Sequence, residues 1–163
     1  MQSDEPTNAY RSKSLMTAIE MASKLFQAIE AKDTTAAAML LADDFKFSGP
    51  VPQPISGSEW LAMQQSLAKA FPDWKFNAAD LREEGGKVLG AVQITGTHKG
   101  ELDLSAIGLP NVPATGKSVK LPREQLTLTV SNGKFTSLST AATEGAGVMG
   151  ILSQLGIKAP IAQ

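Results

Sequence analysis

Hydrophobic and polar residues alternate along the second half of the chain, a pattern typical of β-strands that bury at least one face. The clearest case places Leu126, Leu128 and Val130 on one face and polar residues on the other. Three long strands are expected in this region: Lys87–His98, Val119–Val130 and Lys134–Thr140. The dipeptide Asn132-Gly133 joins the last two, and it is the preferred sequence of a type I′ hairpin turn. The second half is therefore predicted to be an antiparallel sheet.

The first half shows helical spacing instead. Apolar residues that start at Leu15 and end at Ile29 are spaced 4-3-4-3, which places them on one helical stripe. Helices are expected from Ser12 or Ser14 to about Lys32, over Thr35–Ala42 and Glu59–Ala70, and at the end over Val148–Leu155. Short strands are expected at Phe45–Phe47 and Trp74–Ala79. Early helices followed by a meander of strands indicate an α+β fold.

Composition and charge narrow the class of protein. The chain has 163 residues, of which 42 % are hydrophobic and 19 % charged, as expected for one globular domain. Its net charge of −1 without a basic block argues against nucleic-acid binding, and the absence of cysteine excludes thiol chemistry. The longest apolar run, Ala36–Ala42, is too short to span a membrane. The first residues lack the apolar core of a signal peptide, so we expect a cytoplasmic location.

Two glycine-rich motifs resemble nucleotide-binding loops but lack the required context. Gly145–Gly150 matches G-x-G-x-x-G, yet the 13 residues after it contain no acidic residue and leave no room for a βαβ unit. Ala114–Ser118 resembles the end of a P-loop, but strand residues follow where a helix should start. We therefore expect a hinge before the last helix at the first motif and a solvated loop charge at Lys117. No cofactor and no metal ion are expected.

His98 is the only histidine. It lies at the end of a predicted strand, between Gly96 and Gly100. Three roles are open: a local structural hydrogen bond, a place at the rim of a ligand pocket, or a general base. A bulge at Gly96 would turn the ring towards a pocket.

Several short motifs, taken in order, resemble one family. They are Phe71-Pro72-Asp73-Trp74, Gly96-Thr97-His98-Lys99-Gly100, Pro113-Ala114-Thr115-Gly116-Lys117, Asn132-Gly133-Lys134-Phe135 and Gln154-Leu155-Gly156. Over about residues 14–158 the chain resembles the SnoaL-like proteins, the polyketide cyclase branch of the nuclear transport factor 2-like superfamily. The resemblance implies a cone-shaped, curved antiparallel sheet wrapped by the N-terminal helices, as in cystatin-like folds, with a short C-terminal helix. We expect a single domain over 12–158, between a disordered tail at 1–11, whose residues are mostly polar, and a second tail at 159–163.

In the cyclases of this family a histidine–aspartate pair in an apolar pocket closes a ring of a polyketide ester. Carried over to this chain, the histidine position is Thr127 and the aspartate position is Thr140. A threonine hydroxyl is a poor general base near neutral pH. Gln125 is retained and is available to hold a ligand carbonyl. The resemblance therefore implies the fold and the pocket but not the cyclase mechanism.

The family places Gln125 and Thr127 inside the cone, so that Leu126, Leu128 and Val130 face outward. Such an apolar patch is typical of an interface, and we expect a homodimer through it. Alternation alone favours the opposite arrangement, with the leucines packed under the helices and the threonines facing solvent.

Three functions remain open at this point. The first is a protein that binds a small apolar or amphipathic molecule. Its expected ligand-binding residues are Phe47, Gln93, Thr95, His98, Gln125, Thr127 and Thr140. The second is an enzyme, a cyclase, isomerase, lyase or hydrolase, with His98 or Glu144 in place of the lost pair. The third is a protein-interaction module without a ligand.

Overall fold

The computed structural model describes residues 17–49, 53–105, 108–141 and 143–157. The tails expected at 1–11 and 159–163 lie outside these residues. The helices are α2 (Ala18–Glu30), α3 (Thr34–Met39), α4 (Gly57–Ala70) and α5 (Gly147–Gln154). The strands are β1 (Leu41–Ser48), β2 (Ile55–Ser56), β3 (Ala79–Glu84), β4 (Lys87–Val92), β5 (Thr95–Thr97), β6 (Ser118–Lys120), β7 (Glu124–Ser131) and β8 (Lys134–Thr140). The α+β fold expected from the sequence is confirmed.

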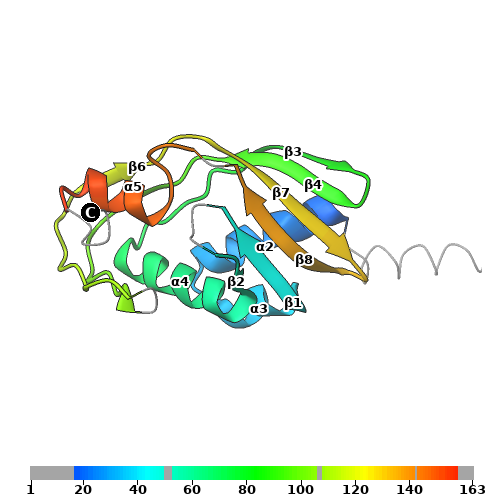
Figure 1. Ribbon diagram of the computed structural model, residues 1–163, viewed down its shortest axis with the longest axis horizontal. Coiled ribbons are helices and arrows are strands. Elements are labelled where there is room, and N and C mark those ends of the chain that lie inside the picture. Colours follow the sequence, from blue (N-terminus) through cyan, green and yellow to red (C-terminus); the bar gives the residue numbers. More distant parts are fainter. Residues whose placement is uncertain (1–16, 50–52, 106–107, 142, 158–163) are drawn as a thin grey trace, which may run out of the picture.

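The main sheet has six strands in the order β2-β1-β8-β7-β4-β3, and β5 and β6 form a separate pair. Helix α2 packs against β3 and β4, whereas α4 packs against β1 and β2. Helix α5 lies at the opposite end from the β7–β8 turn, beside β6 (Figure 1). One strand pair departs from the antiparallel expectation, because β1 runs parallel to β8. The sheet is therefore mixed: β1 pairs antiparallel with β2, which follows it in the chain, and parallel with β8, which lies beyond α4 and the other strands.

Local sequence signals account for the ends of several elements. Asn132 and Gly133 both have positive φ, at 54° and 75°, as the expected type I′ turn requires. Helix α4 begins after Ser56, whose hydroxyl accepts the Glu59 N–H at 3.2 Å while the Glu59 carboxylate accepts the Ser56 N–H at 2.9 Å. This capping box satisfies two amides that otherwise lack partners at a helix start.

The two longest predicted strands are each interrupted. Lys87–His98 divides into β4 and β5, and Val119–Val130 divides into β6 and β7. The second interruption contains Pro122, which has no N–H to donate to a strand partner. The Leu121 N–H still donates to the Ile94 carbonyl at 2.9 Å. The interruption between β4 and β5 therefore lies beside the interruption between β6 and β7. The ribbon therefore changes direction there, and this bend lies next to the cavity described below.

The strand expected at Trp74–Ala79 is largely absent. Lys75 forms a single bridge with Thr95, and β3 starts only at Ala79. Asn77 has a positive φ of 49°, which is incompatible with a regular strand, and the positive φ of Asp80, 57°, falls where the register of β3 shifts. The side-chain amide of Asn77 instead donates to the Gln93 carbonyl at 2.9 Å.

The inner face of β7 carries the leucines. Leu126 is 4 % exposed and Leu128 is fully buried, whereas Gln125 is exposed and Thr127 is half-buried. Val130 is half-buried and also packs against the core. The outward orientation inferred from the family is therefore wrong, because burying the leucines under the helices removes more apolar surface from water. Leu126 and Leu128, through which we expected a homodimer to form, are therefore not exposed on the outer face of the sheet.

Candidate functional site

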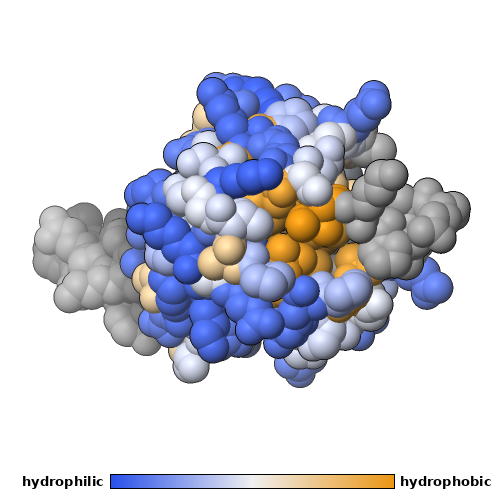
Figure 2. All heavy atoms as spheres, turned by 90° about the vertical axis from the view of Figure 1, so that its left-hand side faces the viewer, coloured by the Kyte–Doolittle hydropathy of each residue, from blue (hydrophilic) through white to orange (hydrophobic). Residues whose placement is uncertain are grey.

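A cavity lies between the sheet and helices α2, α4 and α5. It is narrow and partly open, and the centres of water-sized molecules could occupy about 80 Å³ of it. Its walls are mostly apolar, and five of the lining side chains are aromatic: Phe26, Phe47, Trp60, Trp74 and Phe76. Figure 2 views the end of the molecule near α5 and shows a hydrophobic region, with mostly hydrophilic residues above it, below it and to its left. An apolar pocket lined by aromatic side chains and a few polar groups is typical in composition of a site for a small molecule.

The bend in the long strands brings polar residues to this cavity. At the last pair of β4 and β7, Val92 lies opposite Glu124, and on the next strand Leu126 lies opposite Thr140. Residues that are directly opposite in neighbouring strands share a face of the sheet. All four side chains consequently line the cavity, together with Ile94 from beyond the bend.

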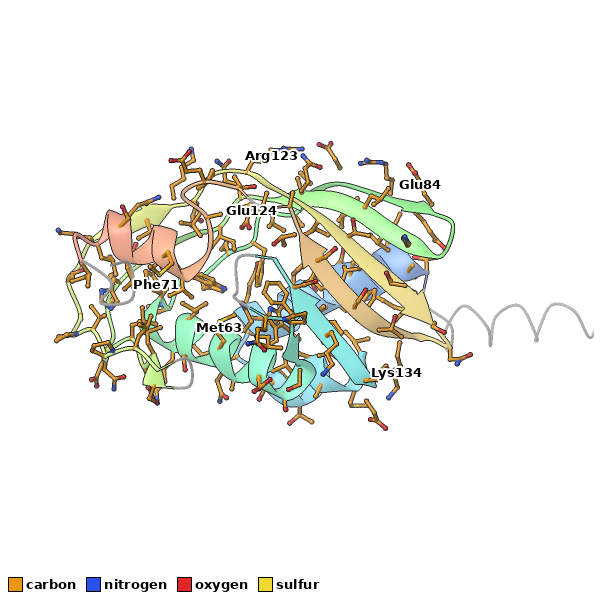
Figure 3. The ribbon with its side chains drawn as sticks, in the orientation of Figure 1. Met63, Phe71, Glu84, Arg123, Glu124 and Lys134 are labelled. Carbon is orange, nitrogen blue, oxygen red and sulfur yellow. The ribbon has the colours of Figure 1, made fainter. Side chains whose placement is uncertain are left out.

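Glu124 is the only ionisable residue among the described residues that line the cavity. It is 4 % exposed, and burial raises the pKa of its carboxyl because the charged form loses its hydration. In Figure 3 Glu124 lies at the start of β7, across from Met63 on α4. A buried carboxyl in an apolar cavity is typical of sites that transfer a proton or bind a polar ligand group.

Glu124 is not among the site residues predicted from the sequence, although its position in the hydrophobic pattern is informative. Glu124, Leu126 and Leu128 are spaced two apart and share one face of β7. Once the leucines are assigned to the core, the same alternation places the carboxyl inside the molecule. The family resemblance directed attention to Gln125 and Thr127, which are on the opposite face.

Unpartnered polar atoms concentrate around the same cavity. Five buried side-chain atoms of the described residues have no hydrogen-bond partner, and four of their residues line the cavity. These four atoms are Trp60 Nε1, Gln64 Oε1, Trp74 Nε1 and Thr140 Oγ1. Trp60 and Gln64 are one helical turn apart on α4, so an N–H donor and a carbonyl acceptor come from the same side of that helix. Each such atom costs free energy unless a partner reaches it.

The residues expected to bind a ligand are divided by the structure. Phe47 and Thr140 line the cavity. The Gln93 amide donates to the Leu121 carbonyl at 3.3 Å, and the Thr95 hydroxyl accepts from Asn77 at 3.2 Å. Both side chains therefore stabilise the bend between the strands. Three further candidates lie elsewhere: Gln125 and Thr127 on the outer face of β7, and Glu144 exposed before α5.

His98 is fully buried but does not line the cavity. Its ring stacks on Phe71 with centroids 5.2 Å apart, and Nδ1 accepts the Thr115 N–H at 3.1 Å. Burial lowers the pKa of the imidazole, which favours its neutral form. No bulge shifts the alternation at Gly96, because β5 pairs with β6 in regular register. Of the three roles, His98 thus has the local structural one. Its ring joins Thr115, through the hydrogen bond, to Phe71 at the end of α4.

The G-x-G-x-x-G segment has a packing role. Gly145 and Gly147 have positive φ, at 86° and 74°, and they flank Ala146, the N-cap residue of α5. A Cβ at Gly150 would lie 1.9 Å from the Gly145 carbonyl oxygen, so the helix can fold back on this turn only without a side chain there. Lys117 was expected to be a solvated charge; it is exposed, but its ammonium also donates to the Leu155 carbonyl at 3.2 Å.

The described part of the chain contains no group of three or more acidic or histidine residues placed to hold a metal ion. The helices formed by these residues include none with the length and apolar character needed to cross a membrane.

Comparisons with known proteins agree with this geometry. A model of the SnoaL-like polyketide cyclase family matches residues 19–138, so the chain belongs to the SnoaL-like polyketide cyclase family. This confirms the resemblance seen in the sequence motifs. None of the curated proteins matches the chain.

Solved structures show the same fold at low sequence identity. IdmH from Streptomyces antibioticus, a proposed polyketide cyclase, has a TM-score of 0.63 and 21% identity over 85% of this chain and 97% of its own. AclR from Streptomyces galilaeus, a proposed hydroxylase, has a TM-score of 0.65 and 18% identity over 84% of this chain and 93% of its own. A nuclear transport factor 2-like protein of unknown function from Cytophaga hutchinsonii has a TM-score of 0.52 and 20% identity over 76% and 88%. Because such different activities are proposed on this fold, function has to be argued from the cavity itself.

Proposed function

We propose that the cavity binds a small, mostly apolar molecule that carries its own hydrogen-bonding groups. The observation that supports this most is the gathering of four unpartnered polar side chains around one cavity whose walls are otherwise apolar. In an ordinary packed core, we would expect such polar groups to be hydrogen-bonded within the protein, or apolar residues to stand in their place.

The chemistry of three of these atoms indicates what the ligand offers. The indole N–H groups of Trp60 and Trp74 only donate, so they call for acceptor oxygens on the ligand. The Gln64 carbonyl oxygen only accepts, so it calls for a hydroxyl or another donor. These atoms have almost no solvent-accessible surface. A ligand therefore has to widen the cavity to reach them, and the hydrogen bonds that it then makes satisfy groups that have no partner within the protein.

Charge further restricts the ligand. Glu124 is the one ionisable side chain on the described cavity wall, so an anionic ligand would meet a carboxylate without a neighbouring cation. Flat aromatic walls favour a planar ring system over a flexible chain. The expected ligand class is an uncharged ring compound that bears hydroxyl or carbonyl oxygens.

Binding of 1-naphthol, naphthalene and 1-naphthoate, measured by titration calorimetry, tests this function. We expect 1-naphthol to bind more tightly than naphthalene by about 2- to 10-fold, the contribution of one net hydrogen bond, and 1-naphthoate to bind most weakly at pH 7. Gln64→Leu should remove the advantage of 1-naphthol over naphthalene. Gln65→Leu is the matched control, because Gln65 is the exposed neighbour on α4. If neither 1-naphthol nor naphthalene binds to the wild-type protein, the proposed function is wrong.

A second candidate function is a cyclase-type proton transfer by Glu124, favoured by its position as a buried carboxyl with a raised pKa in the cavity. A carboxylate there can remove a proton from a carbon next to a ligand carbonyl. The indole N–H groups can then stabilise negative charge on the carbonyl oxygen. The enzyme candidates His98 and Glu144 are not on the cavity wall.

Deuterium uptake at the carbon next to the carbonyl of 1-tetralone, followed by NMR, tests this second function. The wild-type protein should accelerate uptake near neutral pH, and Glu124→Gln should lose most of that acceleration because an amide cannot accept the proton. Glu144→Gln should retain the wild-type rate, since Glu144 is exposed outside the cavity. If the wild-type protein and Glu124→Gln exchange deuterium at the same rate, the proton-transfer function is wrong and ligand binding is the only proposed function that stands.

A further inference from the structure

Helix α5 forms one wall of the cavity through Gly147, Val148 and Ile151. Its last residue, Gln154, is exposed, yet its side-chain amide makes two hydrogen bonds with the backbone of Lys120. The Lys120 N–H donates to Gln154 Oε1 at 2.8 Å, and Gln154 Nε2 donates to the Lys120 carbonyl at 2.7 Å. Figure 1 shows α5 next to β6, which ends at Lys120.

The backbone of Lys120 is available for this contact because of the register of β5 and β6. Lys120 lies opposite Thr95, but Thr95 exchanges both of its backbone hydrogen bonds with Lys75, at 3.0 Å each. The polar backbone groups of Lys120 therefore point away from β5. The Gln154 amide occupies the place of a neighbouring strand and supplies one donor and one acceptor, as a peptide group would.

The other end of α5 is held less firmly. Its first cap, Ala146, has no side chain that can accept a helix amide, and glycines with positive φ lie on both sides of it. Ile151, Leu152 and Leu155 are buried and fix the apolar side of the helix. Near the C-terminal end, Lys117 adds its hydrogen bond to the Leu155 carbonyl. The polar attachment of α5 by side chains is thus concentrated around Gln154, whereas no side chain caps its glycine-rich start.

We propose that Gln154 is a positioning residue of the cavity. By holding the end of α5 on the edge of β6, it keeps Val148 and Ile151 in place as a cavity wall and limits the passage of ligand. Only the passage of ligand rests on the proposed binding function; the attachment of α5 is independent of it.

Amide hydrogen exchange tests the attachment without any ligand. Gln154→Ala removes both hydrogen bonds. Gln154→Glu keeps the size of the side chain but places a carboxylate oxygen against the Lys120 carbonyl. We expect the amides of α5 to exchange about five- to tenfold faster in both variants, while β7 and β8 keep wild-type protection. Ser153→Ala is the control, because Ser153 is the exposed residue beside Gln154.

Unchanged exchange of α5 in Gln154→Ala would overturn the proposal. A loss of protection that extends equally to β7 and β8 would also overturn it, since Gln154 would then support the whole fold rather than one cavity wall.

Stopped-flow binding of N-phenyl-1-naphthylamine, an uncharged fluorescent probe, tests the effect on the cavity. Gln154→Ala should raise both the association and the dissociation rate constants about fivefold or more, because α5 opens more often, and change the dissociation constant less. Wild-type rate constants in Gln154→Ala would contradict the role in ligand passage. If the probe does not bind to the wild-type protein but α5 exchange still responds to Gln154→Ala, the proposed function fails and the attachment of α5 by Gln154 stands.

Discussion

Leu128→Lys is expected to prevent folding, whereas Thr127→Lys in the adjacent position should give a folded protein. Leu128 is fully buried among the core side chains of the sheet and helices. A lysine there would bury an ammonium group without a partner, at a cost of several kcal/mol, in addition to the lost apolar contacts. That cost is a large part of the total stability of about 5–15 kcal/mol that is usual for a domain. Thr127 is half-buried on the outer face, where a lysine can extend into water.

The pair of variants distinguishes the two orientations of β7. Circular dichroism and thermal unfolding should show no cooperative transition for Leu128→Lys and a transition near the wild-type temperature for Thr127→Lys. If Leu128→Lys were folded and merely lost self-association in light scattering, the outward orientation inferred from the family would be right after all, and the arrangement of β7 described above would be wrong.

Patterns within a few residues predicted the local structure well. The Asn132-Gly133 turn needed only the known preference for positive φ, and the start of α4 needed only the capping residues Ser56 and Glu59. The spacing of Ile151, Leu152 and Leu155 likewise predicted the buried side of α5. In each case the residues that decide the structure are close together in the sequence.

Features that depend on distant partners were not predictable in the same way. The parallel pairing of β1 with β8 joins segments separated by most of the chain, and no local pattern encodes it. The bend in the long strands depends on the Leu121–Ile94 hydrogen bond in addition to Pro122. The cavity lies at that bend, so its position could not be obtained from alternation along one strand.

The candidate site shows the limit of transferring positions between relatives. Of the two positions taken from the family, Thr140 does line the cavity, whereas Thr127 faces outward. The difference follows from pairing, because Thr140 lies opposite Leu126 and Thr127 lies opposite Ser139. A carboxyl at Glu124, two residues before Leu126, is instead the group that the inner face of β7 presents to the cavity. An error of one residue in a transferred position moves the side chain to the other face of the strand.

Glu124→Gln is expected to stabilise the protein at pH 8 and to have little effect on stability at pH 4. Burial raises the pKa of Glu124 in the folded state above its unfolded value of about 4.3. Between these two pKa values the folded state binds more protons than the unfolded state, so the free energy of unfolding falls as the pH rises. Glutamine has the same shape and no charge, and it avoids this loss.

The melting-temperature difference between Glu124→Gln and the wild-type protein should therefore be near zero at pH 4 and grow through the window above pH 4.3. A pKa difference of one between the two states corresponds to about 1.4 kcal/mol, and for a chain of this length 1 kcal/mol shifts the melting temperature by about 2–4 °C. Glu144→Gln is the matched control, because the exposed Glu144 should give the same small difference at both pH values. The opposite result would be that Glu124→Gln melts below the wild-type protein at pH 8 but not at pH 4. It would mean that the ionised carboxylate is stabilised in the folded state. Glu124 would then be an ion-pairing residue of the fold rather than the buried, protonatable group of the cavity.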